Sequence, residues 1–407
     1  MQLPKRGVPR DELFAEMRAR KARDADWRGG RTWSLIYPAG EDVDAVLREA
    51  NNLYLFENAL NPFRFPSLRH MESDVVSMTA GLLHGGDESG GCLTSGGTES
   101  ILLAVKTARD RAREERGVTQ PEMVVPLSAH PAFAKAGKYF GVEMKQIPLR
   151  PDLRADVEAA AALINDHTVL VAGSAPNYPH GVIDPIPELA ALAVARNISF
   201  HTDACVGGFL LPFIEPLGYR MPPFDFRVPG VTTISADVHK YGYCTKGASV
   251  LAHRSKDTVR YQAFLYDQWP GGIYGSLAMA GTRPAAPIAA AWAVMNYLGE
   301  DGYRRLAAIV METTRQLRDG IAVIPELHIW GDPDASLMAF GSDDVDIMAV
   351  GDVMDERGWH LDRQQNPAAL HLMVTPNHAT VVAPFLADLR DAAAKPGRSR
   401  GVEARYS

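Results

Sequence analysis

The fold is best worked out from the stretch Val231-Thr-Thr-Ile-Ser-Ala-Asp-Val-His-Lys-Tyr-Gly-Tyr243. Its first four residues are β-branched and apolar, which predicts a short buried strand. The chain then leaves the strand through a polar turn that presents His239 and Lys240, and Gly242 lets the backbone bend closely behind them. Ligands of open α/β sheets bind at the carboxyl ends of the strands. A lysine there can lose its proton and form a Schiff base with a carbonyl, although most lysines that follow strands are solvated ends.

Helices alternate with short buried strands from about residue 72 to residue 253. This alternation predicts an α/β fold whose mostly parallel central sheet has helices on both faces. The expected strands are 123–127, 143–148, 168–173, 198–202, 231–235 and 248–253. The expected helices are 72–84, 99–116, 131–140, 151–165 and 187–196. We interpret residues 85–91, which contain four glycines, as a turn.

The two ends of the chain break this pattern. Residues 1–60 begin with a charged stretch typical of an exposed helix and continue irregularly, so we expect this segment to pack on a partner subunit. Beyond Pro284 we expect helices 285–298, 302–320 and 345–357, with strands near 327–330, 336–341 and 370–374. We therefore predict a large domain over residues 61–290 and a smaller C-terminal α+β domain over residues 291–407.

The composition argues against several classes of protein. A net charge of -7 without any basic run argues against a nucleic-acid partner. The N-terminus is charged throughout, and the longest apolar stretch, 285–298, is too short to span a bilayer, so we predict neither a secretory signal nor a transmembrane segment. Cys92, Cys205 and Cys244 are widely separated and lack metal-ligand spacing, which predicts no metal site. We expect a soluble cytoplasmic protein.

An anion-binding turn is predicted at Thr94-Ser-Gly-Gly-Thr-Glu-Ser100, at the start of helix 99–116. Adjacent glycines, a hydroxyl residue and a helix start place several free N–H groups around one point, with the positive end of the helix dipole behind them. The motif is neither a Walker loop nor GxGxxG, so the anion need not belong to a nucleotide. An ordinary glycine-containing turn capped by Thr98 explains the same residues equally well.

Two further polar residues stand at the ends of predicted strands. Asp203 ends the strand Phe200-His-Thr-Asp203, where a carboxylate is costly unless it meets a cation or hydrogen-bond donors. In a site for a pyridine cofactor that cation is the protonated ring nitrogen, whereas the alternative is a helix N-cap or an acid facing water. His130 precedes a helix, where its ring can stack on a planar cofactor or serve a structural role.

All four features lie at strand ends or at the helix starts that follow them. A phosphate cradle, a ring-stacking histidine, an acid for a ring nitrogen and a Schiff-base lysine are together the minimum for pyridoxal 5′-phosphate (PLP) chemistry. The sequence therefore predicts PLP as the cofactor.

Longer motifs carry a resemblance to a known family. They are Thr94-Ser-Gly-Gly-Thr-Glu-Ser-Ile101, Ser174-Ala-Pro-Asn-Tyr-Pro-His-Gly-Val-Ile-Asp-Pro185, Asp237-Val-His-Lys-Tyr-Gly-Tyr243 and Gly271-Gly-Ile-Tyr-Gly-Ser-Leu-Ala-Met-Ala-Gly-Thr-Arg-Pro284. The chain resembles the fold-type I PLP enzymes of the group II decarboxylase family, from about Tyr37 to at least Pro284. Within that family, the run from Tyr178 to Pro185 and the Tyr-Gly-Tyr after Lys240 are similar to the branch of sphingosine-1-phosphate lyases.

The resemblance implies a role for each matching residue in binding PLP in the large domain. Lys240 would carry the cofactor as a Schiff base, Asp203 would pair with the pyridinium nitrogen, and His130 would stack on the ring. Three residues of the same chain would hold the cofactor phosphate, namely Gly97, Thr98 and His239. Gly275 and Ser276 would reach that phosphate from the partner subunit, so the resemblance implies a homodimer with active sites at the subunit interface.

The resemblance also implies a substrate and a reaction. The substrate would be sphingosine 1-phosphate or a related phosphorylated sphingoid base, cleaved by retro-aldol chemistry to phosphoethanolamine and a long-chain aldehyde. The residues matching its phosphate site are Tyr37, His70 and Lys246, with Tyr178 close to the reacting carbons. The two tyrosines are otherwise loop anchors, and Lys246 is otherwise a solvated cation. Lys240, Tyr178 and a substrate phosphate oxygen are all candidates for the proton transfers.

Two other functions compete with this one. An amino-acid decarboxylase would use the same cofactor residues, and Arg283 would then bind the substrate carboxylate rather than brace the subunit interface. A non-catalytic binding protein on the same fold is less compatible with the presence of both Lys240 and Asp203. Release of carbon dioxide or of an aldehyde separates the two enzymes, and a colourless protein that fails to bind PLP would favour the third.

Overall fold

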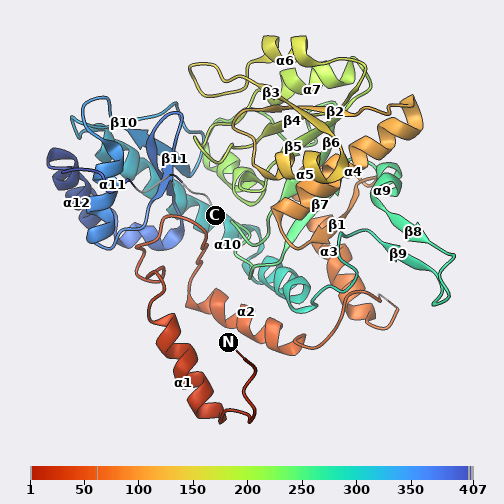
Figure 1. Ribbon diagram of the computed structural model, residues 1–407, viewed down its shortest axis with the longest axis horizontal. Helices are drawn as coiled ribbons and strands as arrows, with labels where there is room; N and C mark the ends of the chain where they lie inside the picture. The colour runs from red at the N-terminus through yellow and green to blue at the C-terminus, as the bar shows by residue number, and fades with distance from the viewer. Residues whose placement is uncertain (1, 62, 402–403, 405–407) are drawn as a thin grey trace.

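The computed structural model describes residues 2–61, 63–401 and 404. Its largest element is a seven-stranded sheet in the order β1-β7-β6-β5-β4-β2-β3 (Figure 1). The strands are β1 (Gly90–Thr94), β2 (Glu122–Pro126), β3 (Glu143–Ile147), β4 (Thr168–Ser174), β5 (Ser199–Asp203), β6 (Val231–Ala236) and β7 (Ser249–His253). Only β7 runs antiparallel to its neighbours in this sheet. The predicted mostly parallel α/β sheet is confirmed.

Helices cover both faces of the sheet because side chains alternate along each strand. On one face, Met123 and Ala172 pack with α4 (Gly97–Arg116) and α5 (Ala132–Phe140). On the other face, Val124 and Phe200 share a core with α7 (Ile186–Val194) and α8 (Leu211–Ile214). Short helices complete this region, namely α6 (Val157–Leu163), α9 (Lys256–Gln262), η1 (Gly207–Phe209) and η2 (Glu215–Leu217).

The predicted strands agree with the structure within two residues at each end, but the helix predicted over 72–84 begins earlier, at Pro66, and two other local predictions were wrong. Residues 90–91, predicted as turn, begin β1, which pairs with β7 at the sheet edge. The helix predicted over 151–165 begins only at Val157, because Leu153 adopts a positive φ of 65° and Asp156 caps the helix by accepting from the Ala159 N–H at 3.1 Å.

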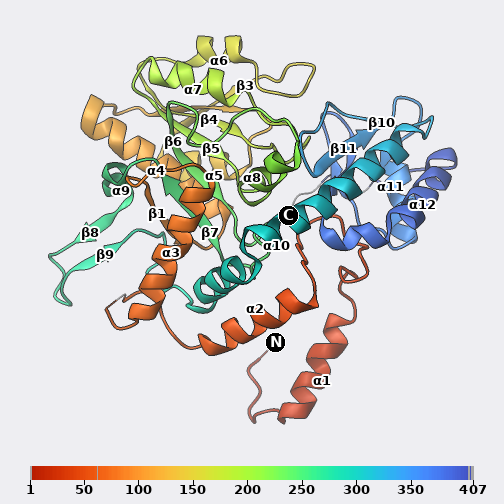
Figure 2. The same cartoon turned by 180° about the vertical axis from the view of Figure 1, so that it is seen from behind.

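A second lobe forms around the C-terminal part of the chain. Its four-stranded sheet has the order β10-β11-β13-β12. The strands are β10 (His328–Ile329), β11 (Leu337–Gly341), β12 (Asp362–Gln364) and β13 (Ala369–Met373), and the helices are α11 (Ile347–Glu356), η3 (Pro376–Thr380) and α12 (Val382–Ala394). The two helices predicted over 285–320 form one long element, α10 (Ala286–Ala322), which is kinked at Gly299. Figure 2 shows α10 running from beneath the large sheet into this lobe.

The N-terminal residues extend from the body of the chain. Helix α1 (Arg10–Lys21) has no buried residue and projects outwards in both views (Figures 1 and 2). Helices α2 (Glu41–Leu53) and α3 (Pro66–Leu82) lie against α10. The boundaries 1–60, 61–290 and 291–407 remain predictions. Among the described residues, no helix combines the length and the hydropathy needed to cross a bilayer.

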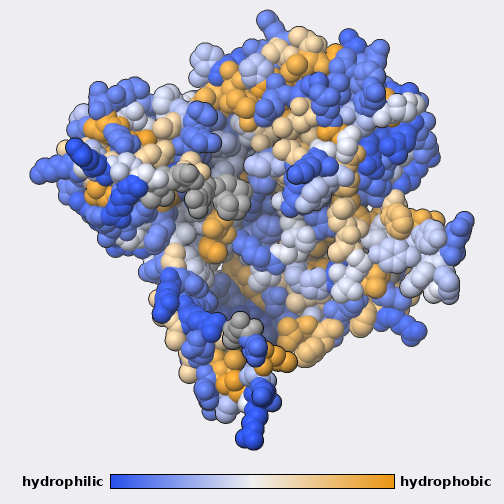
Figure 3. All heavy atoms as spheres, in the orientation of Figure 1, coloured by the Kyte–Doolittle hydropathy of each residue, from blue (hydrophilic) through white to orange (hydrophobic). Residues whose placement is uncertain are grey.

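A hairpin that the sequence patterns did not predict projects from the large sheet. Its strands are β8 (Phe264–Tyr266) and β9 (Tyr274–Ser276), paired antiparallel. Large apolar side chains along it are exposed to solvent, among them Leu265 at 71% and Ile273 at 77%. Pale and orange surface covers much of this projection at the right of Figure 3. Exposed apolar side chains gathered in this way are typical of interaction sites.

Candidate active site

The carboxyl ends of the central strands surround a cavity of about 330 Å³. Lys240 follows β6 and His130 follows β2, so the right-handed parallel topology brings both to the same edge of the sheet. A second, narrow pocket joins these two residues to Asp203 and Tyr178. The main cavity is lined by residues 95–99, Ile101, His130, Cys205, Asp237, His239, Lys240, Lys246 and Gly247. The structure therefore brings the predicted lysine, histidine and acid together.

The Lys240 amine forms an ion pair with Asp237, with 3.0 Å between Nζ and Oδ2. His239 Nε2 lies 3.6 Å from the same oxygen. Burial opposes ionisation of Asp237, but the charge of Lys240 and then that of His239 outweigh it and lower the pKa of this carboxyl. Asp237 is thus held as a carboxylate in the wall of the cavity. Asp237 stood in the lysine motif, but sequence reasoning gave it no role of its own.

The start of α4 lines this cavity, and the anion site expected from its glycines remains a prediction. Gly96 precedes the helix, and no side chain caps it, so the alternative of a turn capped by Thr98 was wrong. A Cβ at Gly97 would lie only 2.6 Å from Cys205 Sγ and 2.9 Å from Asp237 Oδ2, so only glycine fits there. Glu99 shapes the turn by accepting hydrogen bonds from the N–H and hydroxyl of Ser95 at 2.7 and 2.6 Å. The free N–H groups of the helix start therefore face the cavity.

The cavity fits PLP by the chemistry of its lining. Asp237 Oδ1 and His239 Nδ1 are buried polar atoms without a hydrogen-bond partner in the part of the chain that the structure describes. Such atoms are costly unless a bound group satisfies them. An uncapped helix start for a phosphate, an amine for an aldehyde, an imidazole face for a ring and an acid for a ring nitrogen complete the set that PLP requires.

Asp203 and His130 occupy positions that suit a planar ring. Asp203 is 7% exposed, and its Oδ1 accepts from the Cys205 N–H at 3.1 Å and from the Ser235 hydroxyl at 3.3 Å. The alternative of an acid facing water was therefore wrong. Burial lowers the pKa of His130, so its ring is neutral near pH 7. Because His130 Nδ1 accepts from the Ala132 N–H at 3.1 Å, the ring proton is on Nε2.

The residues expected to bind the substrate phosphate are only partly brought together. Lys246 lines the cavity, and its Nζ lies 5.0 Å from the centre of the Tyr37 ring and 3.0 Å from the His239 carbonyl oxygen. His70 is exposed on α3 and does not line this cavity. Gly275 and Ser276 line a separate cavity of about 670 Å³ beside the β8–β9 hairpin. Within one chain, His70, Gly275 and Ser276 therefore lie outside the cavity that contains Lys240.

Tyr178 is held by the C-terminal lobe. Its hydroxyl donates to Asp362 Oδ2 at 2.7 Å, and its carbonyl oxygen lies 2.9 Å from His371 Nε2. The other Asp362 oxygen accepts from Ser34 at 2.9 Å. Sequence reasoning missed Asp362 and His371, because they follow Tyr178 by more than 180 residues and belong to no strand-end motif of the large sheet.

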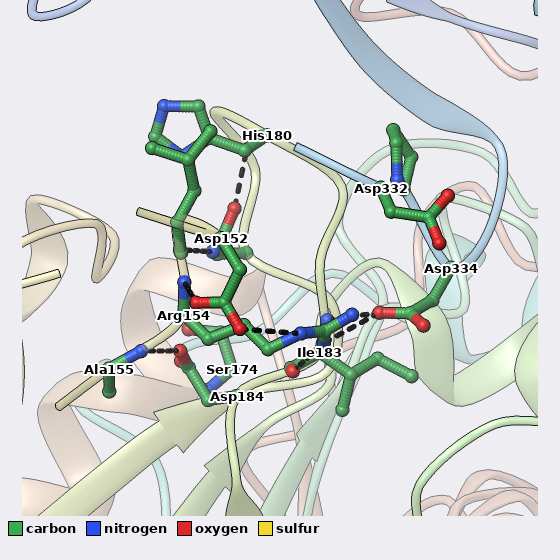
Figure 4. Close-up of polar contacts among 12 residues, drawn as sticks. Asp152, Arg154, Ala155, Ser174, His180, Ile183, Asp184, Asp332 and Asp334 are labelled. Atoms are coloured by element: carbon green, nitrogen blue, oxygen red, sulfur yellow. Dashed lines mark hydrogen bonds and ion pairs between the residues drawn. The ribbon is translucent and has the colours of Figure 1, made fainter. Parts of the chain in front are cut away.

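The segment that carries Tyr178 is also fixed at its far end, as Figure 4 shows. Asp334 accepts hydrogen bonds from Arg154 at 2.8 Å and from the Ile183 N–H at 2.7 Å. Asp184 is fully buried and accepts from the Ser174 and Ala155 N–H groups at 2.8 and 3.0 Å. These contacts join the segment from Ser174 to Asp184 to both lobes.

Replacing Asp334 with alanine is expected to lower the free energy of unfolding by about 1–3 kcal/mol, because the Ile183 N–H and Arg154 both lose an acceptor in a poorly solvated place. Asp332 is the matched control, since its ion pair with Arg318 is at the surface. Its replacement by alanine should cost less than about 1 kcal/mol. Urea denaturation of both variants measures the difference, and equal losses would contradict this role of Asp334.

The chain as a whole is similar to known enzymes. Residues 28–342 match the model of the pyridoxal-dependent decarboxylase conserved domain. The chain is 43% identical to sphingosine-1-phosphate lyase from Arabidopsis thaliana over 96% of this chain and 74% of that protein. It is 42% identical to sphingosine-1-phosphate lyase 1 from Rattus norvegicus, over 96% and 69%.

This chain belongs to the sphingosine-1-phosphate lyase branch of the pyridoxal-dependent decarboxylase family.

The solved structures agree with this assignment. The sphingosine-1-phosphate lyase of Burkholderia pseudomallei superposes with a TM-score of 0.94 at 42% identity, covering 97% of this chain and 92% of that one. Glutamate decarboxylase from Lactobacillus brevis superposes at 0.85, covering 99% and 96%, but at 20% identity that likeness concerns the fold alone. The fold-type I architecture expected from the sequence is thus confirmed.

Arg283 is engaged within the protein. Its two terminal nitrogens lie 2.7 and 2.9 Å from the two carboxylate oxygens of Glu72, and Nη1 also donates to the Leu93 carbonyl at 3.2 Å. A guanidinium paired with a carboxylate in this bidentate way has its charge already compensated. The geometry favours a structural role for Arg283 over binding of a substrate carboxylate.

Proposed function

We propose that this protein is a PLP-dependent carbon–carbon lyase that cleaves sphingosine 1-phosphate or a related phosphorylated sphingoid base to phosphoethanolamine and a long-chain aldehyde. The observation that carries this proposal is the meeting of Lys240, Asp203 and His130 at one edge of the sheet, beside an anion site and Lys246, in a chain of this family. Lys246 adds a cation to the cavity, which suits a substrate that carries its own phosphate.

When bound, PLP supplies an electron sink for the bond that breaks between the amine-bearing and the hydroxyl-bearing carbons. Lys240 would hold the cofactor, and Asp203 would keep its ring nitrogen protonated. The N–H groups around Gly97 and Thr98, together with His239, would hold its phosphate, while neutral His130 would lie on its ring. These residues would fix the ring, so that a substrate clamped at its phosphate could present the scissile bond perpendicular to it.

The substrate hydroxyl must lose a proton as the aldehyde forms. Tyr178 is placed to move it, because Tyr178 lines the narrow pocket beside Lys240. Its own proton is directed at Asp362, so the phenol can take up the substrate proton while releasing its own to that carboxylate. Lys240 is the second candidate for removing this proton. The amine-bearing carbon must then take up a proton to complete phosphoethanolamine, and that proton must come from the side of the cavity where Lys240 lies.

Replacing Lys246 with methionine is expected to raise KM for a phosphorylated substrate by about tenfold or more, because a charge-assisted contact to phosphate is lost. Although Lys246 remains accessible to solvent, removal of water by neighbouring atoms and, secondly, the charge of Lys240 lower its pKa to about 8. The ammonium form exists below that pKa, so kcat/KM of the unmodified enzyme should fall as the pH rises through about 8.

The methionine variant should lack this pH dependence. With an unphosphorylated sphingoid base, the variant and the unmodified enzyme should have similar kcat/KM. Equal losses on phosphorylated and unphosphorylated amines would contradict the assignment of Lys246.

We also propose a homodimer in which the β8–β9 hairpin reaches the neighbouring active site. Two observations support this proposal. The hairpin exposes large apolar side chains, and Gly275 and Ser276 on β9 line a cavity that does not contain Lys240. Light scattering is expected to give twice the chain mass. Joint replacement of Leu265 and Ile273 by aspartate should yield monomers that bind PLP weakly, whereas aspartate at Val323, exposed to 66% on another surface, should change neither. A monomeric wild-type protein with full PLP affinity would contradict the dimer.

We place the protein in the cytoplasm, because Cys92, Cys205 and Cys244 are all free and buried, as suits a reducing compartment. Fractionation of cells into soluble, membrane and secreted material tests this.

Product identification tests the reaction itself. The PLP-loaded protein, incubated with sphinganine 1-phosphate, is expected to release hexadecanal and phosphoethanolamine in equal amounts. Carbon dioxide from an amino acid, with no aldehyde from the phosphorylated base, would instead indicate a decarboxylase. Mass spectrometry of the aldehyde, trapped as a hydrazone, distinguishes the outcomes.

A further inference from the structure

A row of buried polar side chains stands behind Asp203, on the face of the sheet that α5 covers. In the parallel register of β5 and β6, His201 lies opposite Thr233 and Asp203 lies opposite Ser235. Because side chains alternate along a strand, these four point to the same face. His201 and Ser235 are both 0% exposed. A histidine so placed is expensive to bury, and neither the fold nor the proposed reaction has yet accounted for it.

The four side chains form a continuous series of hydrogen bonds. His201 Nδ1 lies 2.9 Å from Thr233 Oγ1, and its Nε2 lies 3.1 Å from Ser235 Oγ. Ser235 Oγ in turn donates to Asp203 Oδ1 at 3.3 Å. The Cys205 thiol also donates to Ser235 Oγ, at 3.2 Å. No water is needed to connect them.

The direction of each proton follows from the inventory of donors. Ser235 has a single hydroxyl proton, and the Asp203 carboxylate is the strongest acceptor within its reach, so that proton points to Asp203. Ser235 must therefore accept from His201, which places the histidine proton on Nε2. Burial lowers the pKa of His201 to about 4, so the ring is neutral and its Nδ1 accepts from the Thr233 hydroxyl. All three protons point towards Asp203.

We propose that the series Thr233–His201–Ser235 is a positioning relay that holds Asp203 ionised and oriented for the ring nitrogen of PLP. This inference rests on the proposed function, in which Asp203 pairs with that nitrogen. Each hydrogen bond in the series polarises the next, so the donor that reaches Asp203 Oδ1 is stronger than an isolated serine. Hydrogen bonds to the charged form of a carboxyl stabilise that form. The relay thereby favours the pyridinium over the neutral pyridine.

A cofactor analogue separates this role from a merely structural one. Deazapyridoxal phosphate carries CH in place of the ring nitrogen and is otherwise the shape of PLP. In Ser235→Ala and His201→Leu, the dissociation constant of PLP should rise about tenfold, which is about 1.4 kcal/mol, while that of the analogue should change less than about twofold. Equilibrium dialysis measures both constants. The visible absorbance band of bound PLP should also weaken or shift in these two variants.

Two variants serve as matched references. His201→Gln retains an amide N–H near the position of Nε2 and should restore most of the PLP affinity that His201→Leu loses. His253 is another fully buried histidine of the sheet, hydrogen-bonded to Thr258 at 2.9 Å and Gln262 at 2.6 Å. His253→Leu should lower the melting temperature but leave the ratio of the two dissociation constants unchanged.

The outcomes distinguish this inference from the proposed function. If Asp203→Asn fails to reduce the preference for PLP over the analogue, Asp203 is not the partner of the ring nitrogen. The role that the proposed function gives to Asp203 is then refuted. If Asp203→Asn reduces that preference but Ser235→Ala and His201→Leu do not, the relay alone is refuted. Equal weakening of PLP and analogue in the relay variants would also refute it, because the residues would then act only on the shape of the cavity.

Discussion

Replacing Lys240 with alanine is expected to lower the turnover of a phosphorylated sphingoid base by at least about three orders of magnitude. We propose the amine of Lys240 as the nucleophile for the cofactor aldehyde, and its ion pair with Asp237 at 3.0 Å holds it in the cavity. The variant should also lose the visible absorbance of the bound cofactor. Rates of aldehyde release and an absorbance spectrum of the purified protein measure the two effects.

The matched control is Lys138→Ala, at an exposed position on α5. It should retain full activity and colour. Because the alanine at position 240 also leaves Asp237 without its ion-pair partner, circular dichroism should establish that the variant is folded. A folded Lys240→Ala protein with unchanged turnover would contradict the assignment of this lysine.

Replacing Asp203 with asparagine is expected to reduce kcat by about a hundredfold to a thousandfold, in the range observed when a preorganised electrostatic contact is removed. Asparagine keeps the shape of the side chain but lacks the charge that holds a ring nitrogen protonated. The loss should therefore appear mainly in kcat rather than in KM, because in the proposed arrangement this carboxyl would contact the cofactor ring and not the substrate phosphate or amine. Steady-state kinetics at saturating PLP measure both constants.

Asp166→Asn is the control for the loss of one negative charge, since Asp166 is a fully exposed acid beyond α6. It should leave both constants within about twofold. An Asp203→Asn enzyme that retains its kcat but requires more substrate would mean that Asp203 binds the substrate instead.

Much of the large sheet was predictable because most of its strands are short runs with buried side chains, separated by clear helical patterns. The sheet edge was not. The β1 strand begins with Gly90 and Gly91, which have little strand propensity, and it exists because it pairs with β7, more than 150 residues further along the chain. The β8–β9 hairpin was missed for a related reason. Its apolar residues face solvent in the single chain, so the hairpin lacks the pattern of buried residues by which strands are predicted.

The residues of the site divide in the same way. Lys240, Asp203 and His130 were identifiable because each ends or follows a strand of the sheet, and the carboxyl ends of parallel strands meet at one edge. The carboxylate of Asp362 was not, since its contact with Tyr178 depends on how the C-terminal lobe packs. The relay was visible in principle. His201 and Asp203 are two residues apart, as are Thr233 and Ser235, and that spacing on neighbouring strands places them on one face.

The most direct test of the account is to locate the cofactor chemically. The purified protein, saturated with PLP, is treated with borohydride, digested and examined by mass spectrometry for the peptide that carries a phosphopyridoxyl group. The account predicts that this group is found on Lys240. Its recovery on Lys246 or on any other lysine, or the absence of a modified peptide from protein that is fully active, would contradict it.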